Sequence, residues 1–405
     1  MEIKVVFLSN GYGEDTISTY IIRELKKIIT NNLKNLDIEK NLNVEILGFP
    51  LVDIGAKYIE NDIKIIAPTK KLKSSGISGL FNLKNFIKDL KDGLIKLIQD
   101  QLKVLSDYKN KPNIYLIAVG DIYPLFVSIF KNKLSKTNVI FIPTAKSYKT
   151  EPFNPFEIYL MSLVNANFVR DELTYQKLKN KLKNVYFVGN PVLDIEYIDP
   201  LSNPNYSNLR LNNNIIVLPG RKEVCIENLS YFSKGINLLL NTLKNIEKSI
   251  NQFVNPTFTV IVPNFYPIDK IQELMNQELN SEYKSRVYIL EDKYYRFVLE
   301  NSYLVWGQAG SGNEQAVGYK LPVIAFNENN WYRKRQKKLL NNCLILIKRY
   351  DIQELINETI NLFIDKDRYR FIQEECIKEM GALGGAQKIA NYIYNLLKDN
   401  LVSKV

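Results

Sequence analysis

Short, mostly apolar runs alternate along the chain with longer segments that carry a helical pattern. KVVFLSN at 4–10 and NIYLIAVGD at 113–121 are two of the apolar runs, and TISTYIIRELKKII at 16–29 is one of the helical segments. Continuous apolar strands separated by helices are typical of a parallel sheet that is covered on both faces. The sequence therefore predicts an α/β fold with a doubly wound parallel sheet.

This alternation occurs twice, and a segment without an apolar period separates the two halves. The separating segment, 194–214, is rich in Asn, Pro and Ser, which is typical of a linker. We therefore expect two Rossmann-like domains that face a cleft, at 1–200 and 210–385, and a C-terminal helix at 386–405 that packs back toward the first domain. The further expected strands are at 43–49, 138–144, 166–171, 185–194, 214–220, 258–263, 286–290, 302–307, 321–326 and 343–347.

The turn that follows the strand 302–307 is rich in small residues. It reads GQAGSGNEQAVGYK and leads into a helix. Gly310 and Gly312 allow a positive φ and a close approach of a ligand, and a helix N-terminus attracts phosphate. A plain connection between strand and helix would also need these glycines. The carboxylate of Glu314, in the first helical turn, either balances the helix dipole or accepts hydrogen bonds from ligand hydroxyls.

Composition excludes several kinds of mechanism. The 405 residues contain no histidine, which excludes Ser-His-Asp, Cys-His and His-metal chemistry and leaves proton transfer to Asp, Glu, Lys, Tyr or Cys. Three cysteines without disulfide or zinc spacing fit a reducing cytosol. The net charge of +11 favours an anionic membrane or a phosphorylated substrate, and we expect no nucleic-acid partner because no such motif is present. The chain enters a strand directly and has no bilayer-length apolar run, which predicts a soluble or peripheral protein.

One segment indicates contact with a membrane. Residues 75–105 set apolar side chains among lysines, and the beginning of the segment has the pattern of an interfacial amphipathic element. A core helix with a lysine-bearing outer face would give the same pattern, and for 93–105 we favour that interpretation. The residues expected to contact an anionic membrane surface are Ile77, Leu80, Phe81 and Phe86.

Four motifs occur at strand ends and helix starts along the chain. They are LPGRKE at 218–223, GNPVLD at 189–194 with the preceding VRDELT, GQAGSGNEQAVGYKLPVIAF at 307–326 and MGALGGAQKIANYI at 380–393. Together these motifs resemble those of the lipid-A-disaccharide synthases, and more closely those of the bacterial proteins called lipid-A-disaccharide-synthase-related. The resemblance implies a metal-independent GT-B glycosyltransferase without a cofactor, with an acceptor domain first and a UDP-sugar domain second.

The resemblance implies a nucleotide-sugar site in the second domain. Glu314 matches an acidic residue that is associated with nucleotide-sugar binding in that family. LPGRKE lacks the serine of the family's LPGSR, so either Arg221 or Lys222 takes the place of the arginine against the diphosphate. From the residues alone, these two could also be a solvated pair. The expected binding residues are Gly220, Arg221, Lys222, Gly310, Ser311, Gly312, Asn313, Glu314 and Gln315.

The resemblance implies acid–base catalysis in the first domain. Asp121, in AVGD, falls at a strand end where the family has an acidic residue, and it is the candidate general base. Glu14 and Asp15, in SNGYGED, fall near the family's first Gly/Glu-rich loop, with a different spacing. The residues alone leave Asp121 equally suited to capping a helix. The only DxD pattern, at 365–367, opens a helix and is interpreted as a cap rather than a metal site.

The function expected from these observations is sugar transfer. We expect a cytoplasmic protein, peripheral on the inner face of a membrane, that moves a sugar from a UDP-sugar to a lipid or lipid-linked acceptor. Two alternatives remain: a UDP-sugar epimerase similar to the UDP-N-acetylglucosamine 2-epimerases, and a nucleotide-sugar-binding protein without activity.

Overall fold

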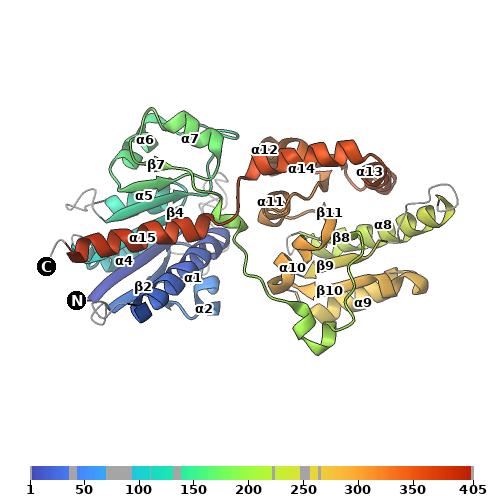
Figure 1. The fold of residues 1–405 in the computed structure, drawn as a ribbon, viewed down its shortest axis with the longest axis horizontal. Helices are drawn as coiled ribbons and strands as arrows, with labels where there is room; N and C mark the ends of the chain where they lie inside the picture. Colours follow the sequence, from blue (N-terminus) through green and yellow to red (C-terminus); the bar gives the residue numbers. More distant parts are fainter. Residues whose placement is uncertain are drawn as a thin grey trace. The chain divides into compact units, whose positions relative to one another are not determined.

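The chain forms two compact units. The computed structural model describes residues 2–35, 43–69, 94–109, 111–130, 138–220, 224–246, 256–262 and 266–402. Unit 1 consists of Met1–Asp194 and Ala382–Val405, and unit 2 of Ile195–Gly381 (Figure 1). No helix in these described ranges is both long and apolar enough to cross a membrane.

Unit 1 is built on a seven-stranded parallel sheet with the order β3-β2-β1-β4-β5-β6-β7. All seven residues of β4 are buried, as expected for a strand covered on both faces. The strands are β1 (Glu2–Ser9), β2 (Asn43–Pro50), β3 (Lys64–Ile65), β4 (Ile114–Gly120), β5 (Val139–Pro143), β6 (Ala166–Phe168) and β7 (Val185–Tyr186). The helices are α1 (Tyr12–Asn35), α2 (Ala56–Glu60), α4 (Leu94–Ser106), α5 (Ile122–Ile129), α6 (Pro155–Ser162), α7 (Glu172–Leu178) and α15 (Gly385–Val402).

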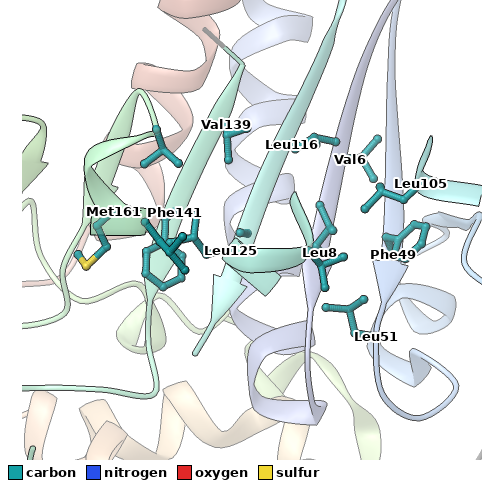
Figure 2. Close-up of a cluster of buried hydrophobic side chains, with 14 of the residues drawn as sticks. Val6, Leu8, Phe49, Leu51, Leu105, Leu116, Leu125, Val139, Phe141 and Met161 are labelled. Carbon is teal, nitrogen blue, oxygen red and sulfur yellow. The ribbon is translucent and has the colours of Figure 1, made fainter. Parts of the chain in front are cut away.

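The core of unit 1 lies between its strands and the helices that cover them. Figure 2 shows side chains of this core, among them Leu8 of β1, Phe49 of β2, Phe141 of β5 and Leu105 of α4. Gln101 of α4 is also buried, and its amide donates to the carbonyl of Leu51 over 3.1 Å. The structure thus packs one face of the helix 94–106, with Leu97, Gln101 and Leu105, against the core. The four residues expected to contact a membrane, Ile77, Leu80, Phe81 and Phe86, lie outside the described residues, so that expectation stays a prediction.

Unit 2 is built on a six-stranded parallel sheet with the order β10-β9-β8-β11-β12-β13. Its core contains stacked aromatic side chains, with Phe232 against both Trp306 and Phe326. The strands are β8 (Asn214–Leu218), β9 (Phe258–Val262), β10 (Val287–Glu291), β11 (Ser302–Gly307), β12 (Val323–Asn327) and β13 (Leu344–Lys348). The helices are α8 (Cys225–Ile246), α9 (Ile268–Glu278), α10 (Tyr295–Glu300), α11 (Ser311–Gly318), α12 (Trp331–Leu340), α13 (Ile352–Ile364) and α14 (Lys366–Met380).

Both sheets confirm the expected fold class, two Rossmann-like doubly wound domains of the GT-B kind. In each sheet the strand order runs outward in one direction from the first strand and then reverses, between β1 and β4 in unit 1 and between β8 and β11 in unit 2. Ligands of such sheets bind outside the carboxyl ends of the strands at this reversal. The two reversal points are therefore where we examine the candidate residues.

The unit boundaries lie at 194/195 and 381/382, whereas the sequence placed them near 200–210 and 385/386. Residues after 194 belong to unit 2 because they are held by its helices and strands: Arg296 Nη1 donates to the carbonyl of Ile195 over 3.1 Å, and Asn203 Nδ2 donates to the hydroxyl of Tyr294 over 3.3 Å. In unit 1, α15 lies against α1 (Figure 1).

Candidate functional site

Two predicted acidic residues, Glu14 and Asp121, follow β1 and β4 at the reversal point of unit 1. β1 and β4 are neighbours in parallel register, with Ser9 opposite Val119, so the loops that follow them start side by side. Asp121 caps α5, because its Oδ1 accepts a hydrogen bond from the backbone N–H of Tyr123 over 2.8 Å. A Cβ on Gly120 would lie 3.2 Å from Cγ of Glu14, which places Glu14 next to the β4 loop.

Asp15, the third predicted acidic residue, is enclosed in a buried network. The hydroxyl of Ser9 donates to Oδ1 of Asp15 over 2.6 Å and is also bonded to the hydroxyl of Tyr58 over 2.7 Å. Burial raises the pKa of Asp15 to about 7, against the opposing effect of the Ser9 hydrogen bond. The hydrogen bond from Ser9 ties Asp15, and with it α1, to β1. Asp15 is only 2% exposed, whereas Asp121 and Glu14 are only partly buried.

The environment of Asp121 suits a group that exchanges protons. Burial raises the pKa of its carboxyl, hydrogen bonds from the Tyr123 backbone and the Asn10 side chain lower it, and the negative charge of Glu157 raises it further. Asp121 is thus both a helix cap and a carboxyl with a perturbed pKa, so the cap and the acid–base interpretations do not exclude each other.

Sequence reasoning missed an ion pair near this edge. Nζ of Lys146, just after β5, lies 2.9 Å from Oε1 and 2.8 Å from Oε2 of Glu157 in α6. Glu157 also forms a capping box with Asn154, whose backbone N–H donates to Glu157 Oε2 over 2.7 Å. The sequence predicts the strand at 138–144 that precedes Lys146, but the partner of Lys146 on α6 follows only from the tertiary structure.

The reversal point of unit 2 brings together two loops that carry predicted binding residues. Gly220, after β8, has a φ of 91°, and a Cβ there would lie only 2.7 Å from the carbonyl oxygen of Gln308, after β11. Glycine is therefore required for the two loops to approach. Arg221 and Lys222 lie outside the described residues, so their contact with a diphosphate stays a prediction.

The turn after β11 leads into α11, for which Gly310 is the N-cap. The backbone N–H groups of Asn313 and Glu314 donate to the carbonyl of Gly310 over 3.1 and 3.3 Å. The helix itself gives the amides of Ser311 and Gly312 no carbonyl partner, which is the arrangement that suits an anion. The remaining predicted residues of this loop, Asn313, Glu314 and Gln315, are buried in α11, whereas Ser311 is exposed.

Neighbouring side chains pack tightly on this turn. The Nδ2 of Asn313 donates to the carbonyl of Gly307 over 3.0 Å, and the hydroxyl of Tyr295 donates to the carbonyl of Gly312 over 2.8 Å. A Cβ on Gly310 would lie 2.2 Å from the hydroxyl oxygen of Tyr332 in α12. The backbone of the turn is therefore held in place by α10, α11 and α12 together.

Two of the four family-like motifs form a structural junction within unit 1. Asp194 accepts hydrogen bonds of 2.6 Å each from the backbone N–H groups of Gly384 and Ala386, at the start of α15. The backbone N–H of Asn190 donates to the carbonyl of Ala382 over 3.3 Å. GNPVLD and MGALGG thus hold α15 on unit 1.

Asp365, the first residue of the DxD pattern at 365–367, is the N-cap of α14.

Comparison with solved structures shows what this fold resembles. No protein-family model matches the sequence, and no curated protein matches it. The chain is similar to a UDP-N-acetylglucosamine 2-epimerase (TM-score 0.57, 13% identity, 96% of this chain and 95% of that chain) and to a putative one from Listeria monocytogenes (TM-score 0.55, 14% identity, 98% of each chain). It is also similar to the UDP-GlcNAc 2-epimerase from Neisseria meningitidis bound to UDP-GlcNAc (TM-score 0.53, 16% identity, 98% of this chain and 100% of that chain).

These similarities correct the expected function. The expectation of a glycosyltransferase that acts on a lipid or lipid-linked acceptor is wrong, because the structures named above are epimerases of a nucleotide sugar. The motifs behind that expectation are strand ends, helix starts and glycine turns, which different enzymes of one fold can share. At these identities the likeness establishes the fold alone.

Proposed function

We propose that the protein is a UDP-sugar epimerase that inverts C2 of UDP-N-acetylglucosamine or a close relative of that sugar. The observation that carries this proposal is the fold, which matches UDP-GlcNAc 2-epimerases over nearly the whole length of both chains. Fold alone does not specify chemistry, so the proposal also draws on the residues at the two reversal points.

Unit 2 supplies the nucleotide-binding part of the proposal. The N-terminus of α11 offers the amides of Ser311 and Gly312, and its dipole favours a diphosphate. The Glu314 carboxylate, in the first turn of the same helix, is suited to accept hydrogen bonds from ribose or sugar hydroxyls. An anionic ligand also suits the net charge of +11.

Unit 1 supplies the acid–base part. Inversion at C2 breaks the bond from that carbon to hydrogen and forms a new one on the opposite face, so one group must accept the proton and one must return a proton. In a chain without histidine these groups must come from other side chains. Burial raises the pKa of Asp121, and the negative charge of Glu157, which is paired with Lys146, raises it further. Glu14 lies next to Gly120, the residue before Asp121. We assign the acceptance of the proton from C2 to Asp121.

Proton exchange at C2 tests the proposal. Incubation of the full chain with UDP-GlcNAc in D2O should place deuterium at C2 and produce the C2 epimer, both of which are visible by proton NMR. Asp121→Asn should slow the exchange by about 10²- to 10⁴-fold while leaving the dissociation constant for UDP unchanged. Asp100→Asn, at an exposed position of α4, is the matched control and should exchange as the wild type does.

Two results would contradict the proposal in different ways. Binding of UDP-GlcNAc without any uptake of deuterium would identify a nucleotide-sugar-binding protein without this activity. Failure of the wild type to bind UDP, by calorimetry at millimolar ligand, would reject both the nucleotide site and the epimerase.

A further inference from the structure

Arg333 places a buried positive charge directly behind the turn after β11. It lies in α12 and is 2% exposed. Within the described part of the chain its guanidinium forms no ion pair, and its hydrogen bonds run to two neutral amides, Gln336 Oε1 and, over 2.7 Å, Gln308 Oε1. Because an unpaired buried charge is costly, proteins usually compensate it with a carboxylate or a bound anion.

The guanidinium fixes the orientation of both amides. Arginine can only donate hydrogen bonds, so the oxygen of each glutamine must face it and the NH2 group must point the other way. For Gln336 this leaves Nε2 as the donor to the carbonyls of Ala309, over 3.2 Å, and Gly310, over 3.0 Å. Gln336 thereby connects Arg333 to the backbone of the turn.

Gln308 is left with an unused donor. Its Nε2 is buried and has no hydrogen-bond partner among the described residues, although its Oε1 is occupied by Arg333. Gln308 follows β11 at the reversal point, where its backbone N–H donates to the carbonyl of Leu218 over 2.8 Å and its carbonyl touches Gly220. A buried polar group without a partner, at the place where ligands of this fold bind, indicates a group that a ligand satisfies.

We infer that Gln308 Nε2 donates a hydrogen bond to the diphosphate of the bound nucleotide and that Arg333 supplies the charge behind that bond. Arg333 does not touch the ligand, so it acts as a positioning residue. Its guanidinium holds the Gln308 amide with the NH2 group pointing away from Arg333 and polarises that amide, which strengthens the donor. The negative charge of Glu328 acts on Arg333 without forming an ion pair with it, and the diphosphate in turn supplies further negative charge. The inference rests on the proposed nucleotide site.

A series of ligands with increasing charge tests the inference. Calorimetry should compare uridine, UMP and UDP on the wild type and on Gln308→Met, which keeps the length of the side chain and removes the donor. We expect UDP to bind about 10- to 100-fold more weakly to the variant, as for the loss of one hydrogen bond to a charged group, and uridine to bind equally well. Gln277→Met, on the exposed face of α9, is the matched control and should change no affinity.

A second variant separates charge from packing. In Gln308→Glu the new carboxylate would pair with Arg333, so we expect an unchanged or raised melting temperature together with a larger loss of UDP affinity than in Gln308→Met. If Arg333 and Gln308 only held the turn together, affinity and melting temperature would fall in parallel. Should Gln308→Met fail to fold, the UDP affinity and the melting temperature of Gln308→Glu alone distinguish a role in binding from a role in packing.

The outcomes distinguish this inference from the proposed function. A wild type that binds UDP, with variants that lose uridine and UDP equally or lose neither, would overturn the role of Gln308 and leave the nucleotide site intact. A wild type that binds no UDP would reject the nucleotide site itself, and the inference with it.

Discussion

Asp15 should make the stability of unit 1 depend on pH near neutrality. Burial raises the pKa of its carboxyl from 3.8 to about 7. Below pH 3.8 Asp15 holds its proton in both the folded and the unfolded chain, and above about pH 7 it has lost the proton in both. Between the two, the unfolded chain releases a proton that the folded chain keeps, so a rise in pH favours unfolding. The slope is about 1.4 kcal/mol per pH unit, which gives a loss of about 4 kcal/mol between pH 4 and pH 7.

Asp15→Asn should remove this dependence. The amide oxygen can still accept the hydrogen bond from Ser9, but the side chain no longer ionises. We expect the variant and the wild type to have similar free energies of unfolding at pH 4, and the variant to be the more stable above pH 7. Ser9→Ala should strengthen the dependence, because it removes the hydrogen bond that lowers the pKa of Asp15. The pH range over which the free energy of unfolding falls should then extend to higher pH.

The assay must report on unit 1. Both tryptophans, Trp306 and Trp331, belong to unit 2, so tryptophan emission does not follow unit 1. Amide hydrogen exchange in β1 and α1 reports the stability of unit 1. The difference in exchange rates between the wild type and Asp15→Asn isolates the contribution of this one carboxyl. Identical pH profiles of the two proteins from pH 4 to 8 would refute the reasoning, since they would show that the proton on Asp15 is not linked to folding.

Three further substitutions test single contacts. Gly120→Ala should destabilise unit 1 by about 1–3 kcal/mol, because φ is 135° there and the new Cβ would lie 2.0 Å from Oδ1 of Asn10; Gly13→Ala, with nothing within 4 Å, is the control in a thermal melt. Asp194→Ala should cost about 1–2 kcal/mol and speed amide exchange at the start of α15, and unchanged exchange there would contradict its capping role. Glu314→Gln should weaken UDP-sugar binding about tenfold at an unchanged melting temperature, whereas wild-type affinity would leave Glu314 as a partner of its helix dipole only.

The strands could be predicted where burial alone determines them. Runs such as 302–307 are apolar because both faces of the sheet are covered, and β11 has these same bounds. The expected strand at 185–194 was too long: β7 ends at Tyr186, and Pro191, which lacks a backbone donor, opens a short 3-10 turn capped by Asn190. Local chemistry of this kind overrides an apolar pattern at strand ends.

The candidate site could be predicted only in part, because its side chains pair across the fold. Glycines and carboxylates at strand ends are visible in the sequence and led to Asp121 and to the turn before Glu314. The pairing of Lys146 with Glu157 and of Gln308 with Arg333 joins different elements. The segment WYRKRQKK has the composition of a solvated basic helix, and nothing in it distinguishes the buried arginine from its exposed neighbours.

Gly120 and Gly220, at the two reversal points, are weaker indicators of a ligand site than the sequence indicates. Gly120 and Gly220 both have a positive φ, and each is pressed against the loop of the neighbouring strand, against Asn10 in unit 1 and Gln308 in unit 2. Contact between loops therefore already requires glycine, without any ligand. The more specific signal lies in the residues they touch: Oδ1 of Asn10 and Nε2 of Gln308 are buried without a hydrogen-bond partner in the described ranges. Packing explains the two glycines, whereas only a further polar partner would satisfy these two atoms.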